Sequence, residues 1–121
     1  MKRLFIIVVL LLGLATPAGA YEKGTLGYMI EMHAKEVQYE SWLEERLFSM
    51  QDGIGWANAV NETKGYPLLY CQPRQMVLKG EQIFDIMKRY AETRKDVMTA
   101  SSAALGLYII RSLSEVFPCP K

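Results

Sequence analysis

Two cysteines, Cys71 and Cys119, place the strongest constraint on how this 121-residue chain can fold. Each lies in a short signature, LYCQP and VFPCP. Pro73 keeps the first cysteine in extended backbone, and Pro118 ends the helix that precedes the second. Cysteines of small exported domains generally pair, so we expect one Cys71–Cys119 disulfide. It would close a loop of about 49 residues and restrict the unfolded chain by roughly 4 kcal/mol.

The first twenty residues have the pattern of a secretion signal. A basic start, MKR, is followed by an apolar run over residues 4–14 and by small residues ending at Ala20, as in a cleaved signal peptide. The apolar run is shorter than the roughly 20 residues of a membrane-spanning helix. We therefore expect cleavage after Ala20, a bacterial periplasmic location, and a single mature domain over residues 21–121 that is not held in the membrane. An uncleaved anchor is the alternative.

Composition argues against several function classes. Without the signal, 12 basic residues face 13 acidic ones, and the bases of the second half are interspersed with acids, which argues against nucleic-acid binding. No Cys/His cluster has metal-ligand spacing, and no phosphate-binding loop or nucleophile motif is present. Glu44 and Glu45 are adjacent and point in different directions on a helix. The sequence therefore predicts no enzymatic activity, metal or cofactor, and His33 is interpreted as a packed or half-exposed side chain.

Hydrophobic periodicity predicts an all-α fold, a small single-domain bundle of about four helices with one disulfide. The first helix begins near Leu26 with Thr25 as its N-cap. It either continues as one rod or breaks within residues 38–41, where Ser41 and Glu44 form a capping-box pattern. The second helix reaches Val60.

The later elements are predicted in the same way. A loop over residues 61–67 follows the second helix, and the third helix begins near Gly80. A polar break at residues 94–96 precedes the last helix, over residues 99–116. The expected buried stripes are Ile83, Ile86, Met87 and Tyr90 in the third helix, and Ala103, Ala104, Leu107, Ile110, Leu113 and Phe117 at the end.

Two glycines in the second helix and several aromatic residues of the chain need a structural interpretation. Gly53 and Gly55 each weaken a helix by about 1 kcal/mol relative to Ala, and we interpret them as points where a neighbouring helix approaches closely. The aromatic side chains exceed what a small core needs, and some can anchor a protein interface. Core packing is the simpler interpretation for three of them, Trp56, Tyr70 and Tyr108. Of the other two, Trp42 follows the helical period of the second helix and Tyr66 lies in the loop after it.

An ordered set of short motifs covers residues 51–119. It comprises Gly55-Trp56, Tyr70-Cys71-Gln72-Pro73, the segment Val77–Gln82 with Ile83, Tyr90, and a closing run with Leu113, Glu115, Val116, Phe117, Pro118 and Cys119. In these motifs the chain resembles the Rap/Tai-type family, whose best-known members are immunity proteins against type VI secretion amidase effectors. A further cysteine of that family is replaced here by Gly53, and one in its first helix is absent, consistent with the loss of one disulfide.

The resemblance implies a periplasmic immunity protein that binds a peptidoglycan amidase toxin and occludes its active cleft without chemistry of its own. The candidate contacts are Glu62, Thr63, Lys64 and Tyr66, in a short polar loop tipped by an aromatic ring. The loop could equally be an ordinary connector. The alternatives for the protein are another periplasmic binding or stress protein of the same fold, or a small acid-stress-type chaperone. A homodimer is compatible with each of these.

Overall fold

The computed structural model describes residues 21–121, and the predicted secretion signal lies outside them. Within these residues the regular elements are all helices, and no β-strand is formed. Its helices are α1 (Leu26–Lys35), α2 (Val37–Thr63), α3 (Gly80–Glu92), α4 (Lys95–Met98) and α5 (Leu105–Val116), with a 3-10 turn, η2 (Ser102–Ala104), before α5. The predicted all-α domain is confirmed. Residues 21–121 contain five α-helices rather than about four, because the short α4 begins within the expected polar break.

The first helix begins as predicted and ends earlier than predicted. The Thr25 hydroxyl accepts a hydrogen bond from the Tyr28 backbone N–H, which caps α1. Glu36 then adopts extended backbone and separates α1 from α2. The break thus falls just before residues 38–41, and Ser41 lies inside α2. The capping-box interpretation of Ser41 is therefore wrong, because α2 already begins at Val37.

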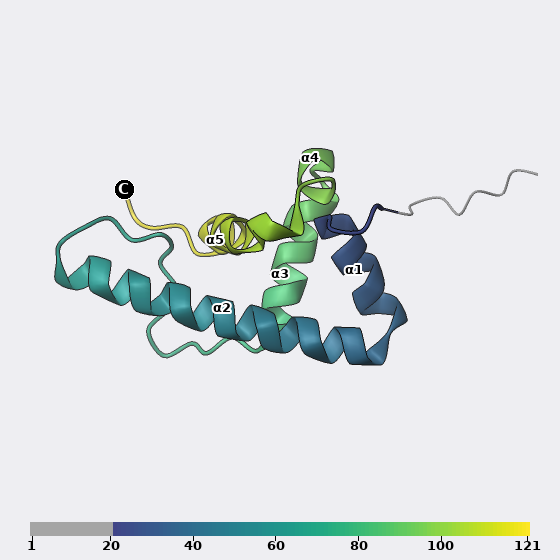
Figure 1. The fold of residues 1–121 in the computed structure, drawn as a ribbon. Helices are drawn as coiled ribbons and strands as arrows, with labels where there is room; N and C mark the ends of the chain where they lie inside the picture. The colour runs from purple at the N-terminus through teal and green to yellow at the C-terminus, as the bar shows by residue number, and fades with distance from the viewer. Residues whose placement is uncertain (1–20) are drawn as a thin grey trace, which may run out of the picture.

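Helix α3 occupies the centre of the fold. In Figure 1 it stands between α1 and α5 and meets α2 at its lower end. Its predicted apolar stripe is confirmed, since Ile83 and Met87 are fully buried and Ile86 and Tyr90 pack at the edge. The core that surrounds these side chains comprises Leu26, Met29, Ile30, Leu43, Leu47, Tyr70, Leu78, Phe84, Ala91, Val97, Leu105, Ile109 and Leu113.

Close backbone approach occurs at the start of α3. A Cβ atom built on Gly80 would overlap the backbone carbonyl of Glu44 in α2, so only glycine lets α3 begin there. A Cβ built on Gly53 or Gly55 would meet no atom within 4 Å. The predicted close helix contact at those two glycines is therefore wrong within the described chain.

The last helix begins at Leu105 rather than near Thr99. The backbone before it pairs with the segment that leads into α1: Leu26 N–H donates to Ala100 O at 3.0 Å, and Ser102 N–H donates to Gly24 O at 2.7 Å. At this pairing Ser101 has extended backbone, and the chain then passes through η2 before α5 begins.

The buried stripe of α5 is consequently different from the predicted one. Leu113 is buried as expected, and Ala104, Ile110 and Phe117 are partly buried. Leu107 is 45% exposed and Ala103 is exposed, so both were wrongly assigned to the core. Their places are taken by Leu105, Ile109 and Ser112.

The predicted disulfide is present. Cys71 and Cys119 are bonded, with their Cα atoms 4.9 Å apart. Beside the bond, Cys71 N–H donates to Phe117 O at 2.8 Å. The segment after α2 is thereby fastened to the end of α5. Among residues 21–121 no helix is both long and apolar enough to cross a membrane.

Candidate functional site

The second half of α2 and the chain returning from it form an extension that we call the arm, residues 48–77. The buried residues of α2 are Leu43 and Leu47, and beyond them the helix buries none. Figure 1 shows this part of α2 extending past α3, with the following segment turning at its end and coming back toward the body. Much of the surface of α2 in the arm therefore faces solvent, including the side chains of Phe48, Trp56 and Val60.

A tight turn ends the arm. Gly65 has a φ of +72°, which glycine adopts without strain. Its N–H donates to Glu62 O at 3.1 Å, and Tyr66 N–H donates to Asn61 O at 2.8 Å, the two bonds of a Schellman motif. Helix α2 thus continues to Thr63, so the predicted loop over residues 61–67 starts three residues later than expected.

Two asparagines brace the returning segment against α2. The Asn58 amide accepts from Leu69 N–H at 2.7 Å and donates to Tyr70 O at 3.0 Å. Asn61 donates to Pro67 O at 3.3 Å. These side chains replace the backbone partners that an irregular segment lacks. The end of the arm is consequently held in one conformation by hydrogen bonds and, further along, by the disulfide.

The four predicted contact residues lie together at this end of the arm. Glu62 and Thr63 are on the last turn of α2, and Lys64 and Tyr66 are in the turn that follows. The Glu62 carboxylate pairs with Arg74 of the returning segment, and the Thr63 hydroxyl donates to Val60 O.

The exposure of the aromatic side chains decides between core packing and anchoring of a protein interface, the two interpretations made from the sequence. Tyr70 is buried and Tyr108 is half-buried, as the core interpretation expects. Trp56, however, is 70% exposed, so the core interpretation is wrong for it; Tyr66 is 59% exposed.

Trp56 belongs to a continuous exposed strip. Gly53, Trp56, Ala57 and Val60 are all exposed, and their spacing puts them on one side of the helix. We call these four residues the outer face of the arm. A large indole flanked by two small residues there leaves room for a partner's side chains.

A groove lies between α2 and the returning segment. Its volume is about 410 Å³, and it is lined by Gly55, Asn58 and Glu62 on one side and by Tyr70, Cys71 and Arg74 on the other. Most of its polar atoms are engaged in the hydrogen bonds and the ion pair that brace the arm. The Cys71 sulfur in its lining is bonded to Cys119, and the volume of the groove is sufficient for a partner side chain.

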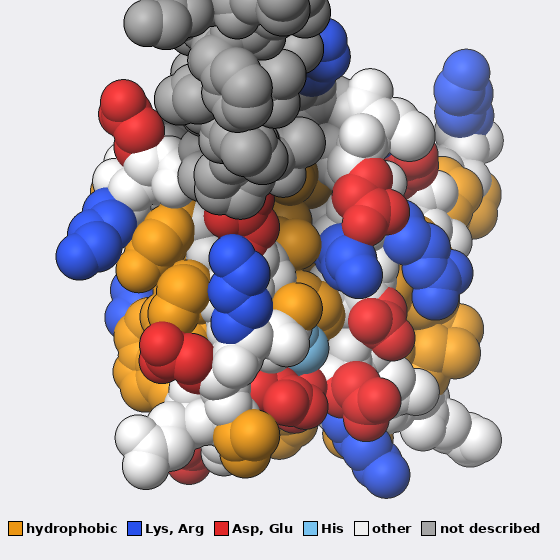
Figure 2. Space-filling view, turned by 90° about the vertical axis from the view of Figure 1, so that its right-hand side faces the viewer, with side chains coloured by type: hydrophobic (Ala, Val, Ile, Leu, Met, Phe, Trp, Pro, Cys, Tyr) orange, Lys and Arg blue, Asp and Glu red, His pale blue; other side chains and the backbone are white. Residues whose placement is uncertain are grey.

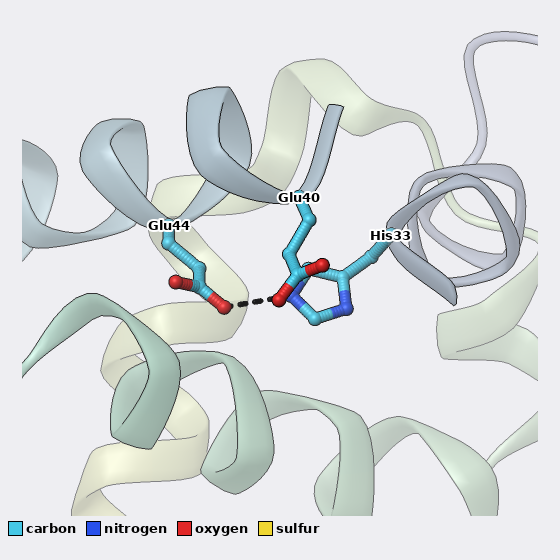
Figure 3. Close-up of side chains that lie close together, drawn as sticks. All are labelled: His33, Glu40 and Glu44. Atoms are coloured by element: carbon cyan, nitrogen blue, oxygen red, sulfur yellow. Dashed lines mark hydrogen bonds and ion pairs between the residues drawn. The ribbon is translucent and has the colours of Figure 1, made fainter. Parts of the chain in front are cut away.

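A second group of polar side chains lies at the corner between α1 and α2. Figure 3 shows His33 of α1 and the carboxylates of Glu40 and Glu44 of α2 pointing toward one another. His33 Nε2 and Glu44 Oε1 are 3.0 Å apart, and the imidazole stacks on the Phe84 ring of α3. From the sequence, Glu44 was compared only with Glu45, and the two were rejected as a pair. The group with His33 was missed, although the four-residue spacing of Glu40 and Glu44 indicates that they share a helix face.

The chain matches no family model, no curated protein and no solved structure. Its resemblance to the Rap/Tai-type family therefore stays a prediction. The functional interpretation depends on that resemblance together with the geometry of the arm.

Proposed function

We propose that this protein is a periplasmic immunity protein whose arm binds a peptidoglycan amidase effector of type VI secretion and occludes its active cleft. The observation that carries the proposal is the presence of two exposed aromatic side chains, Trp56 and Tyr66, on a braced projection. Trp and Tyr are the residues that most often supply binding energy at protein interfaces.

The bracing matters as much as the exposure. Association loses binding free energy when loops and side chains must be ordered. Here the Schellman turn, Asn58 and Asn61 already hold the aromatic end of the arm in place. A partner would meet a surface whose backbone is ordered before contact.

The shape of the arm supports occlusion. A single helix with its returning segment is narrower than the body of the domain, and its end carries Lys64 and Tyr66 beside the Glu62–Arg74 ion pair. Such an end can enter a cleft while the outer face contacts the rim. Inhibition would then result from blocking the substrate's path, without any reaction by this chain.

The proposed compartment agrees with the covalent structure. Disulfides persist in oxidising compartments such as the periplasm, and the Cys71–Cys119 bond fastens the base of the arm. A peptidoglycan amidase delivered to the periplasm would meet the protein there.

The first observation needed is whether a gene beside this one encodes a peptidoglycan amidase, and the direct experiment is then an inhibition assay with that neighbouring amidase. Peptidoglycan hydrolysis is measured with increasing amounts of the purified protein, and an amidase of unrelated sequence serves as the control. We expect stoichiometric inhibition of the neighbouring amidase alone. Undiminished hydrolysis at excess protein would refute the proposal, and suppression of aggregation only at low pH would favour the chaperone alternative.

A further inference from the structure

We propose that His33, Glu40 and Glu44 form a binding site for a divalent transition metal of the zinc type at the corner between α1 and α2. One ligand atom from each of the three residues lies within 4.8 Å of the other two. This juxtaposition is separate from the arm, and nothing in the proposed immunity role requires it.

The distances suit a small metal ion. Zinc bonds His nitrogen and carboxylate oxygen at about 2.0–2.2 Å, which sets neighbouring ligand atoms roughly 3.4 Å apart in a tetrahedral site. His33 Nε2 and Glu44 Oε1 are already 3.0 Å apart. The separations of the Glu40 oxygen from the other two ligand atoms are at most 4.8 Å, so they must shorten by no more than about 1.4 Å to complete the three-ligand set.

The imidazole and one carboxylate are held in position before any metal binds. The His33 ring stacks on Phe84 with centroids 3.5 Å apart and planes inclined by 15°. Glu44 is fixed at its backbone, where Gly80 of α3 packs against it. The side chains of His33 and Glu44 are 15% and 25% exposed, so the pair is partly shielded from water while an ion can still enter from outside.

The local charge also favours a cation. In the described part of the chain, neither Glu40 nor Glu44 forms an ion pair with a Lys or Arg. Figure 2 looks at the side of the molecule on which α1 lies in Figure 1 and shows several acidic side chains in its lower half, with basic side chains between and beside them. Two carboxylates with only a histidine between them leave negative charge that a metal ion would neutralise.

The donor set indicates which metal. An imidazole nitrogen suits zinc and its neighbours in the transition series, whereas Mg²⁺ and Ca²⁺ prefer oxygen ligands throughout. Three protein ligands would leave a fourth position for water. Because His33 and the two glutamates lie on opposite sides of the break at Glu36, a bound ion would also fix the angle between α1 and α2.

The test is calorimetric titration of the purified, chelator-treated protein with Zn²⁺ and, separately, with Mg²⁺. Glu40→Gln is the decisive variant, because Glu40 makes no ion pair within residues 21–121 and its loss should leave the fold intact. Glu45→Gln, at an exposed position of the same helix, is the matched control.

We expect the unmodified protein to bind Zn²⁺ at a single site and to bind Mg²⁺ far more weakly. Changes to residues that only support a metal ligand weaken binding by about 10–100-fold, so Glu40→Gln should lower Zn²⁺ affinity at least tenfold and Glu45→Gln should not change it. The proposal is overturned if Zn²⁺ does not bind, if several weak sites fill together, or if the two variants bind equally. Inhibition of an amidase by the metal-free protein would leave the immunity proposal standing whichever result is obtained.

Discussion

Removing the Cys71–Cys119 disulfide should destabilise the domain strongly. The bond joins residues separated by 48 positions, and the ring it closes contains α3, α4 and α5. On the loop-entropy account, cutting a ring of this size frees the unfolded chain by about 4 kcal/mol. That is a large fraction of the roughly 5–15 kcal/mol by which domains are usually stable.

The assay is urea unfolding of Cys71→Ser, Cys119→Ser and the double variant, with the unmodified protein measured with and without reductant. Each single variant should lose about 4 kcal/mol, and the double variant should lose no more than either single one, because all three lack the same bond. The dependence of the unfolding free energy on urea should also steepen, since the unfolded chain without a cross-link exposes more surface.

Two results would refute this reasoning. A loss below about 1 kcal/mol would mean that the hydrogen bond from Cys71 N–H to Phe117 O and the packing around it already hold the two segments together. A double variant whose loss equals the sum of the two single losses would mean that each cysteine acts through its own contacts rather than through the bond.

Two further predictions concern glycine and tyrosine. Gly53→Ala should raise the free energy of unfolding by about 0.5–1 kcal/mol, because the new methyl group meets open space on a helix. Gly80→Ala should lower it by about 1–3 kcal/mol, because the new methyl group overlaps the Glu44 carbonyl. Equal effects of the two substitutions in urea unfolding would contradict this assignment. Burial, aided by the neighbouring Tyr28 phenol, raises the pKa of Tyr39 above 10.0. The folded state therefore favours the neutral phenol, and this contribution to stability is complete below pH 10 and is lost as the pH rises through the raised pKa. Tyr39→Phe should flatten the loss of stability in alkaline solution, and an unchanged pH profile would count against it.

Local signals predicted the parts of the fold that local chemistry decides. Thr25 caps α1 because its hydroxyl reaches an unsatisfied backbone N–H. Gly80 begins α3, and the spacing of Ile83 and Met87 identified the face that is buried. The disulfide followed from two cysteines in a chain with an export pattern.

The features that were missed depend on contacts between distant segments. No glycine or proline marks the break at Glu36, and its position is tied to how α1 and α2 pack. Residues 99–104 lack a strong helix-breaking residue, yet their backbone pairs with residues 24–26. The same break at Glu36 brings His33 to Glu44, eleven residues further on. The spacing of Glu40 and Glu44 indicates a shared helix face, but no pattern in the sequence indicates that His33 joins them.

Only some features of the arm were predicted correctly from the sequence. Its end and Tyr66 were proposed as contacts from the composition of the loop, but core packing was taken as the simpler interpretation of Trp56. The structure leaves it 70% exposed, because the bundle ends before that part of α2 is covered.

The central claim is that the arm is the surface that binds a protein partner. The most direct measurement compares the affinity of Trp56→Ala and Trp42→Ala, by calorimetric titration, for the amidase that the unmodified protein inhibits. Both side chains are exposed tryptophans of α2, at 70% and 47%, but only Trp56 lies on the arm. We predict that Trp56→Ala weakens binding by about 30-fold, equivalent to the roughly 2 kcal/mol of an interface hot spot, while Trp42→Ala changes it less than threefold. Equal affinities for the two variants, or a larger loss with Trp42→Ala, would contradict the assignment of the arm.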